Sequence, residues 1–545
     1  NANTARSAWA NPSAGGTAID QQIYASAGGE GAIDNSGTIL VNMIASAVAP
    51  SGSAKANSRA YGSYQSVETG TDGGSATGSV VNSGNIVVTS VANASAMAAA
   101  NADADATGLD FYIITNPNGG DTNLDIENSG SLTVLALADA ISDSASASAN
   151  ADARGIYTDE ESNANATGTI TNSSDSSIDV VAVANASASG RANTRSTAFG
   201  VLQNVGANLD TDATLINSGS ISASAIANSF SSNSNANSSA NAQAVSQESD
   251  STETGSSVGL IQNSGTINAI AVAQSTANGN VSSNASARAH AEAVQQHVSA
   301  TSNATGTITN ASDSSINAFG VANASALGNA NANANVGAVQ QDIYSQDGDA
   351  TGLIDNSGTI TASANAQAFS TSASASANAN AMGVRQDVEA DESSSAMASG
   401  TVINTSDSSI NAYAFASATA YDDANAEAGA TGVEQIVSSS GDATATVDNS
   451  GTIDAAAIAL AFSTESAASG DAEALGIFQG VYASGNASGT ISNTSGSSID
   501  VMALANVSAS GFANARANAV SVEQEVEASA DATGTVSNSG AIEAN

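Results

Sequence analysis

Carboxylate and amide side chains are the residues of this chain whose spacing suggests chemistry. An acidic column recurs seven residues before a repeated Asn and comprises Asp121, Asp210, Asp349, Asp442 and Asp531. Asp and Asn often close turns by bonding to their own backbone. Carboxylate and carbonyl oxygens are also the ligands of Ca²⁺. Both interpretations stay open, although the Gly-Gly-x-Gly-x-Asp pattern of calcium-binding β-rolls is absent, which favours the turn.

Other catalytic or metal-binding chemistry finds little support. The chain has two His residues, His290 and His297, and no Cys, so a His/Cys metal site is not expected. No His recurs near a fixed Ser, so a hydrolytic triad has no base. Acidic residues concentrate in variable segments and form no convergent set. We therefore predict no catalytic residues, no enzymatic activity and no cofactor other than the Ca²⁺ considered above.

Charge and composition restrict the partners. The 545 residues include only nine Lys and Arg, and the net charge is -42. Nucleic acid and anionic membrane surfaces both require a basic face, so neither is expected to bind. No apolar run reaches the ~20 residues of a membrane-spanning helix, so membrane insertion is not expected. The chain begins at Asn1 without a visible signal peptide, which suggests a processed protein or a fragment. Its small, polar, acidic composition favours an extracellular or cell-surface location.

A repeated segment organises the chain. The stretch from Leu353 to Ile360 returns, loosely spelled, around twelve Asn residues separated by 44 to 48 positions. A fixed period of this kind indicates a repeat architecture whose units share one core. We expect a single repeat domain over residues 1–545, with partial repeats at 1–30 and 539–545. The twelve positions are Asn35, Asn82, Asn128, Asn172, Asn217, Asn263, Asn310, Asn356, Asn404, Asn449, Asn493 and Asn538.

Alternation within a repeat predicts β-strands. From Ile354 to Ala368 every second residue is apolar, Asn or Gly, and the intervening residues are polar. This period of two is typical of strands with one buried face. The parity slips near Phe369 and again at Met382-Gly383, where we expect corners or bulges. The fold class is therefore all-β, a β-solenoid (β-helix) of about twelve ~46-residue repeats, each with about four strands and an Ala-rich core.

Stacking must supply the stability, because Ala buries little apolar surface. Columns of identical amides are expected to form ladders along the stack, as they do in other stacked sheets. One repeat per coil would stack these residues directly, whereas coils of 20–25 residues would give two coils per repeat, and both remain open. Besides the Asn column, the predicted Gln column contains Gln65, Gln203, Gln247, Gln295, Gln386, Gln435, Gln479 and Gln524.

When the C-terminal residues are written directly before the N-terminal residues, the repeat pattern continues without a break in its alternation. We expect unpaired strands at both ends of the stack, and such edges recruit further strands. A head-to-tail contact between copies would form an open filament. Trp9 is either a cap residue or a contact between subunits. The predicted interface comprises Asn1, Ala2, Asn3, Trp9, Ile542, Glu543, Ala544 and Asn545.

Three stretches, Gly306 to Asn310, Ile354 to Ile360 and Val447 to Ile453, carry Gly-Thr-Ile and Asn-Ser-Gly-Thr-Ile motifs. They resemble the β-helical repeats of secreted bacterial adhesins and autotransporter passengers. This resemblance implies surface display, adhesion and self-association.

Two functions follow as hypotheses. One is a structural subunit of an extracellular filament or matrix that polymerises head-to-tail. The alternative is a monomeric cell-surface adhesin rod that binds a glycan or host surface. Ice binding is a weaker third, because Thr is scattered.

Overall fold

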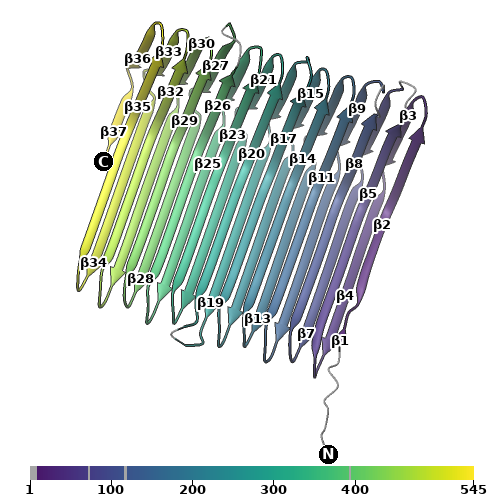
Figure 1. The fold of residues 1–545 in the computed structure, drawn as a ribbon, viewed down its shortest axis with the longest axis vertical. Coiled ribbons are helices and arrows are strands. Elements are labelled where there is room, and N and C mark those ends of the chain that lie inside the picture. The colour runs from purple at the N-terminus through teal and green to yellow at the C-terminus, as the bar shows by residue number, and fades with distance from the viewer. Residues whose placement is uncertain (1–8, 71–73, 116–118, 281, 392–394) are drawn as a thin grey trace, which may run out of the picture.

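The computed structural model describes residues 9–70, 74–115, 119–280, 282–391 and 395–545. Within these residues the chain is a β-solenoid built from three parallel sheets, here named A, B and C. Figure 1 shows the coils side by side, from the purple N-terminal end to the yellow C-terminal end. No helix long and apolar enough to cross a membrane occurs in the described part of the chain.

Each coil visits sheets A, B and C in turn. Sheet A contains the long strands β1 (Trp9–Ala10), β2 (Ser13–Ala25), β5 (Ser53–Thr69), β8 (Ala100–Thr115), β11 (Ala147–Ser162), β14 (Ala192–Ala207), β17 (Ala236–Ser251), β20 (Ala285–Ala300), β23 (Ala330–Ser345), β26 (Ala375–Ala390), β29 (Ala424–Ser439), β32 (Ala468–Ala483) and β35 (Ala513–Ala528).

Sheet B contains the short strands β3 (Gly29–Asn35), β6 (Ala76–Asn82), β9 (Thr122–Asn128), β12 (Ala166–Asn172), β15 (Thr211–Asn217), β18 (Ser257–Asn263), β21 (Ala304–Asn310), β24 (Ala350–Asn356), β27 (Met397–Asn404), β30 (Asp442–Asn449), β33 (Ala487–Asn493) and β36 (Ala532–Asn538).

Sheet C contains β4 (Thr38–Ala49), β7 (Asn85–Ala96), β10 (Ser131–Ser142), β13 (Ser177–Ala188), β16 (Ser220–Ser231), β19 (Thr266–Ala277), β22 (Ser315–Ala326), β25 (Thr359–Ser370), β28 (Ser409–Ala420), β31 (Thr452–Ser463), β34 (Ser498–Ala509) and β37 (Ala541–Ala544).

One repeat forms one coil. Gln386 on β26 pairs in register with Gln435 on β29, and Asn356 on β24 pairs with Asn404 on β27. Each residue therefore lies beside its equivalent one full repeat away, at the ~4.8 Å spacing of paired strands. The alternative of two coils per repeat is wrong. The Ala segment packs against a different sheet from the Gln segment, so the two halves of a repeat are not equivalent layers.

The number of strands per repeat was overestimated. The Ala segment and the Gln segment are one continuous 16-residue strand, such as β26, so a coil has three strands rather than four. The parity slip at Met382-Gly383 is a local bulge inside that strand, where Gly383 and Val384 are both turned inward. A Cβ atom on Gly383 would lie 2.6 Å from the carbonyl oxygen of Gly432 in the next coil. Only Gly or another small residue therefore suits the bulge.

The core has two parts. The Ala half of each sheet A strand packs against sheet C, where Ala faces Ala across the thin interior. The Gln half packs against sheet B, and inward side chains of sheet A such as Val298 and Ile343 fill the space between the two sheets. Between sheets B and C, the chain turns through left-handed backbone at Asp175, Asp313 and Asp407, and through Gly496 at the same place in a fourth coil. In these four coils an Asp-Ser-Ser or Gly-Ser-Ser segment follows the repeated Asn and lengthens the corner, while the strands on either side stay in register.

Candidate assembly surfaces

The repeated Asn residues form one buried ladder at the corner between sheets B and C. Each Nδ2 donates a hydrogen bond to the Oδ1 of the Asn one coil later, as Asn310 does to Asn356 and Asn356 does to Asn404, both at 2.8 Å. The chain of bonds is unbroken from Asn35 to Asn538. The Asn ladder was predicted correctly, including Asn35, Asn82, Asn128, Asn217, Asn263, Asn356, Asn449 and Asn538.

The Gln residues form a second buried ladder that runs in the opposite direction. Each Nε2 donates to the Oε1 of the Gln one coil earlier, as Gln524 does to Gln479 at 2.7 Å. From Gln203 to Gln479, each Gln of the ladder also donates to a carbonyl oxygen of sheet B, which joins the two sheets. The continuous run comprises Gln203, Gln247, Gln296, Gln341, Gln386, Gln435, Gln479 and Gln524.

The assignment of Gln295 to this ladder is wrong. Gln296 is fully buried and bonds to Gln247 at 2.8 Å, whereas Gln295 lies on the outer side and accepts a hydrogen bond from Gln243. The bulge before this segment turns both Ala293 and Val294 inward, so the second of the two adjacent Gln residues takes the inward position. Gln341, also second of a Gln pair, was missed for the same reason. Counting two residues from the bulge Val would have identified both.

The Gln ladder is interrupted in the early coils. Gln65 donates to Gln21 at 2.5 Å, but the next two coils place Phe111 and Thr158 in this column. Two residues after Thr158, Glu160 lies fully buried in a column that is apolar apart from Glu160 and Ser249. Neither carboxylate oxygen of Glu160 has a hydrogen-bond partner among the described residues. Burial, and secondarily the charge of Asp159, raises the pKa of Glu160 well above its usual value. The carboxyl group is therefore expected to be neutral in the folded protein.

The predicted acidic column lies along one exposed edge, at the entry to sheet B. Asp121 Oδ1 accepts a hydrogen bond from the backbone N–H of Asn165 at 3.1 Å, and Asp349 Oδ1 accepts one from Met397 N–H at 2.9 Å. Asp210 and Asp442 make the same contact, whereas in the last coil the N–H of Asp531 donates to an Asn side chain. The bonds thus reach the next coil, and the expected bond to the residue's own backbone is wrong.

Calcium binding at this column stays a prediction. Successive aspartates lie two or three coils apart, roughly 10 to 14 Å at ~4.8 Å per coil. Ca²⁺ takes ligands at about 2.3–2.6 Å, so two members of the column do not share one ion. In the described ranges, no group of three or more His, Cys, Asp or Glu side chains is arranged to hold a metal.

The last described coil presents an open face. The column that contains Ile491 is buried at 1% exposure, but Val536 in the same column of β36 is 50% exposed. Strand β37 pairs only with Ser498–Val501 of β34. The predicted interface residues Ile542, Glu543 and Ala544 lie on β37, and Asn545 follows it and bonds to the backbone of β34 at 2.9 Å.

The remaining predicted interface residues are at the N-terminus. Asn1, Ala2 and Asn3 lie outside the described residues, and so does the side chain of Trp9. The backbone of Trp9 begins β1, which pairs with Ser53 and Ala54 of β5 in the second coil.

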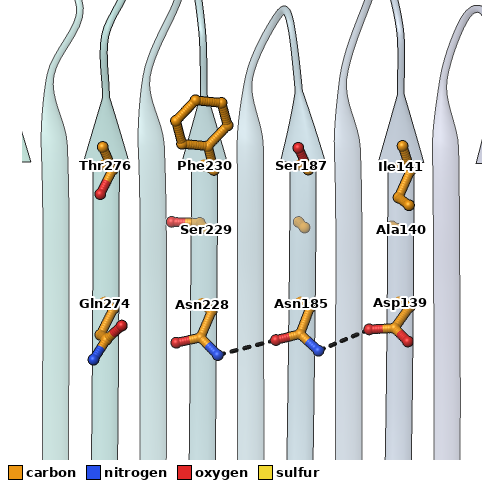
Figure 2. A pocket seen from close by; sticks show the side chains of 11 residues that line it. Asp139, Ala140, Ile141, Asn185, Ser187, Asn228, Ser229, Phe230, Gln274 and Thr276 are labelled. Atoms are coloured by element: carbon orange, nitrogen blue, oxygen red, sulfur yellow. Dashed lines mark hydrogen bonds between the residues drawn. The ribbon is translucent and has the colours of Figure 1, made fainter.

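The outer sides of sheets A and C differ in character. Sheet A carries ion pairs such as Arg59–Asp105 at 3.0 Å, and a row of tyrosines, Tyr64, Tyr112 and Tyr157, with ring centroids 5.8 and 5.7 Å apart. Beside this row, burial raises the pKa of Asp110 to about 6. Sheet C instead carries a shallow groove in which Ile141 and Phe230 flank Ser187, above hydrogen-bonded Asp139, Asn185 and Asn228 (Figure 2).

Comparison with known protein families, with curated proteins and with solved structures finds no match to this chain.

Removing one ladder amide should destabilise the solenoid. Asn356→Ala leaves the buried amides of Asn310 and Asn404 short of a partner, and we expect it to lower the free energy of unfolding by about 1–3 kcal/mol. The readout is the midpoint of urea unfolding followed by circular dichroism. Asn331→Ala, on the exposed side of sheet A, is the matched control and should leave the midpoint almost unchanged. Equal midpoints for the two variants would show that the ladder contributes no net stability.

The buried carboxyl of Glu160 should make stability depend on pH. Its pKa is raised in the folded state, so the unfolded chain loses the proton first, near its ordinary value of about 4.3. Stability is therefore highest below that pH and falls as the pH rises towards the folded pKa. Glu160→Gln should abolish this loss and stabilise the protein at pH 7 relative to the native chain.

The exposed neighbour Glu161 provides the matched control, because Glu161→Gln removes the same charge from the same strand. Thermal unfolding between pH 4 and pH 8 measures both variants. A Glu160→Gln protein that keeps the native dependence on pH would contradict a neutral buried carboxyl group.

Proposed function

We propose that the protein is a structural subunit of an extracellular filament, in which the last coil of one copy receives the first coil of the next. Support comes first from the exposed core residues of the last coil, such as Val536. A parallel strand offers the same pattern of N–H and C=O groups at its free edge as every internal strand offers its neighbour. A further coil on this face would thus repeat contacts that already hold the solenoid together.

The direction of the two amide ladders carries the proposal. On the last coil, Asn538 Nδ2 has no acceptor and Gln524 Oε1 has no donor within the described residues. On the first coil, Gln21 Nε2 has no acceptor there and Asn35 Oδ1 receives only the N–H of Gly37. One end therefore lacks what the other supplies, in both ladders. Two copies stacked head-to-tail would join Asn538 to Asn35 and Gln21 to Gln524.

This complementarity selects one geometry. Head-to-head contact would bring donor to donor in one ladder and acceptor to acceptor in the other, which is unfavourable in a buried setting. Head-to-tail contact is heterologous, and a heterologous contact that does not close produces an open filament. The composition, with 51 acidic and nine basic residues, is consistent with an extracellular location, and salt or Ca²⁺ would reduce repulsion between copies.

An adhesin rod is the second candidate function. The tyrosine row of sheet A, with Asp110 and Asp159 beside it, combines aromatic faces with hydrogen-bonding carboxylates, the groups that contact sugar rings. A glycan array decides whether the protein binds carbohydrate. Carbohydrate binding that is lost in the Tyr112→Ala variant would favour this function over the filament if the native protein also forms no filaments.

Filament growth should depend on Asn538. Asn538→Asp keeps the acceptor used by Asn493 but removes the donor and places a carboxylate opposite Asn35 of the next copy. We expect the native protein to form long filaments in electron micrographs, and the variant to associate at least about tenfold more weakly, the loss of roughly 1.4 kcal/mol.

Asn514→Asp is the control, because it adds the same charge to the outer side of the last coil without touching either ladder. Strictly monomeric native rods at high concentration, with Ca²⁺ present, would argue against the filament. So would undiminished assembly of Asn538→Asp.

A further inference from the structure

The outer side of sheet C carries an apolar stripe along the whole solenoid. The stripe consists of the residues that occupy one equivalent, outward-facing position on successive strands of sheet C. This position is apolar in each of these strands except β25, where it is Asn365. Its members are half-buried in most coils, and Ile44 and Leu504 are exposed by 58% and 48%. In chain order the other members are Val91, Leu137, Val183, Ile226, Val272, Val321, Phe415 and Ile458.

A second outward column, four residues further along each strand, mixes bulky and small side chains, and a polar column that contains Asp139, Asn185 and Asn228 lies between it and the stripe. Val48, Ile141, Phe230, Phe369 and Phe462 are separated along it by Ser or Thr, so the surface has projections and gaps. Figure 2 shows one such gap, where Ser187 lies between Ile141 and Phe230 and lines a groove of about 480 Å³ together with them. Such a surface is able to interdigitate with a copy of itself.

Charge is scarce on this face. The strands of sheet C contain no Lys or Arg and only five acidic residues in a chain that has 51. Two copies of a chain with a net charge of -42 repel one another, so contact between them is least unfavourable where charge is sparse. The absence of basic residues also disfavours an anionic membrane as the occupant.

We propose that the outer face of sheet C binds the same face of a second copy, so that solenoids associate side by side. An apolar stripe that stays exposed along a soluble protein marks a candidate interaction site, and here it lies within a face that also carries the polar column of Asp139, Asn185 and Asn228. Eleven strands at ~4.8 Å and twelve residues at ~3.3 Å give a face of roughly 2,000 Å². A standard interface needs only about 800 Å² per partner.

A second copy matches the face better than other occupants. It has the same coil spacing, the same length and the same alternation, so contacts in one coil are repeated in the next. Face-to-face sheets pack about 10 Å apart with interdigitated side chains. The stripe is mainly branched aliphatic rather than aromatic, which suits packing against its own kind. Because the end faces take no part, this association does not depend on the proposed filament.

The test introduces charge into the stripe on three successive coils. Val183→Glu, Ile226→Glu and Val272→Glu are combined in the Asn538→Asp background, so that end-to-end growth is suppressed and only lateral pairing is measured. Sedimentation should show paired rods for Asn538→Asp alone and at least about tenfold weaker pairing for the combined variant. The control carries Asn193→Glu, Asn237→Glu and Ser286→Glu on the outer side of sheet A and should still pair.

A second measurement does not depend on the charged variants. The chain has no Cys, so Ser187→Cys and Ser239→Cys each create a single thiol, the first in the groove of sheet C and the second on sheet A. With rising protein concentration, Cys-specific labelling should slow at the first site only. Monomeric rods with unprotected thiols at both sites would overturn the proposal. Loss of binding to a purified polysaccharide in the Glu variant, without any pairing of the parent, would assign the face to a glycan instead.

Discussion

The structure depends on the placement of each residue beside its own equivalent one coil away. This placement holds because one repeat has the length of one coil. A side chain in the core then meets two copies of itself or of a similar residue. For an amide this is an ideal partner, since each group both donates and accepts, and Asn356 bonds to Asn310 and Asn404 through the same kind of contact. The core therefore tolerates a buried polar column, which would be costly in an ordinary globular interior.

The same arrangement localises its own defects. Stability in stacked repeats is approximately a sum of terms between neighbours. Where Phe111 and Thr158 interrupt the Gln column, Gln65 Oε1 and Thr158 Oγ1 are buried without partners among the described residues. Glu160 lies at the same break, between Ile113 and Val205. From Gln203 onwards the ladder continues without interruption. The two mismatched coils thus disturb only their neighbours, and the rest of the stack does not have to adjust.

The alternation of apolar and polar residues and the ~46-residue period predicted most of the fold. The alternation follows from a strand with one buried face, and the period follows from one repeat per coil. The alternation identifies the buried residues between Ile354 and Ala368, and the period identifies the Asn ladder. The strand count failed because a parity slip looks the same whether the chain turns a corner or bulges within a strand, as it does at Gly383. Gln295 was misassigned for a related reason, since adjacent Gln residues differ only in parity. The apolar stripe of sheet C was overlooked, although near-continuous apolar runs such as Val180-Val181-Ala182-Val183 are typical of strands covered on both faces.

The distribution of charge bears on how a highly acidic chain could make the two contacts proposed above. Ion pairs such as Arg385–Glu434 and Arg516–Asp471 lie on sheet A, whereas the strands of sheet C are nearly uncharged. The buried Asn and Gln ladders, through which the proposed axial contact would form, are also uncharged. Electrostatic repulsion between two copies therefore comes mainly from the acidic residues of sheet A and of the corners between the sheets. A solenoid with this distribution is kept soluble on one side while the proposed contacts, along the axis and across sheet C, meet little electrostatic opposition. In the proposed filament, the polarity of the amide ladders would specify the direction of growth, which apolar contacts alone would not.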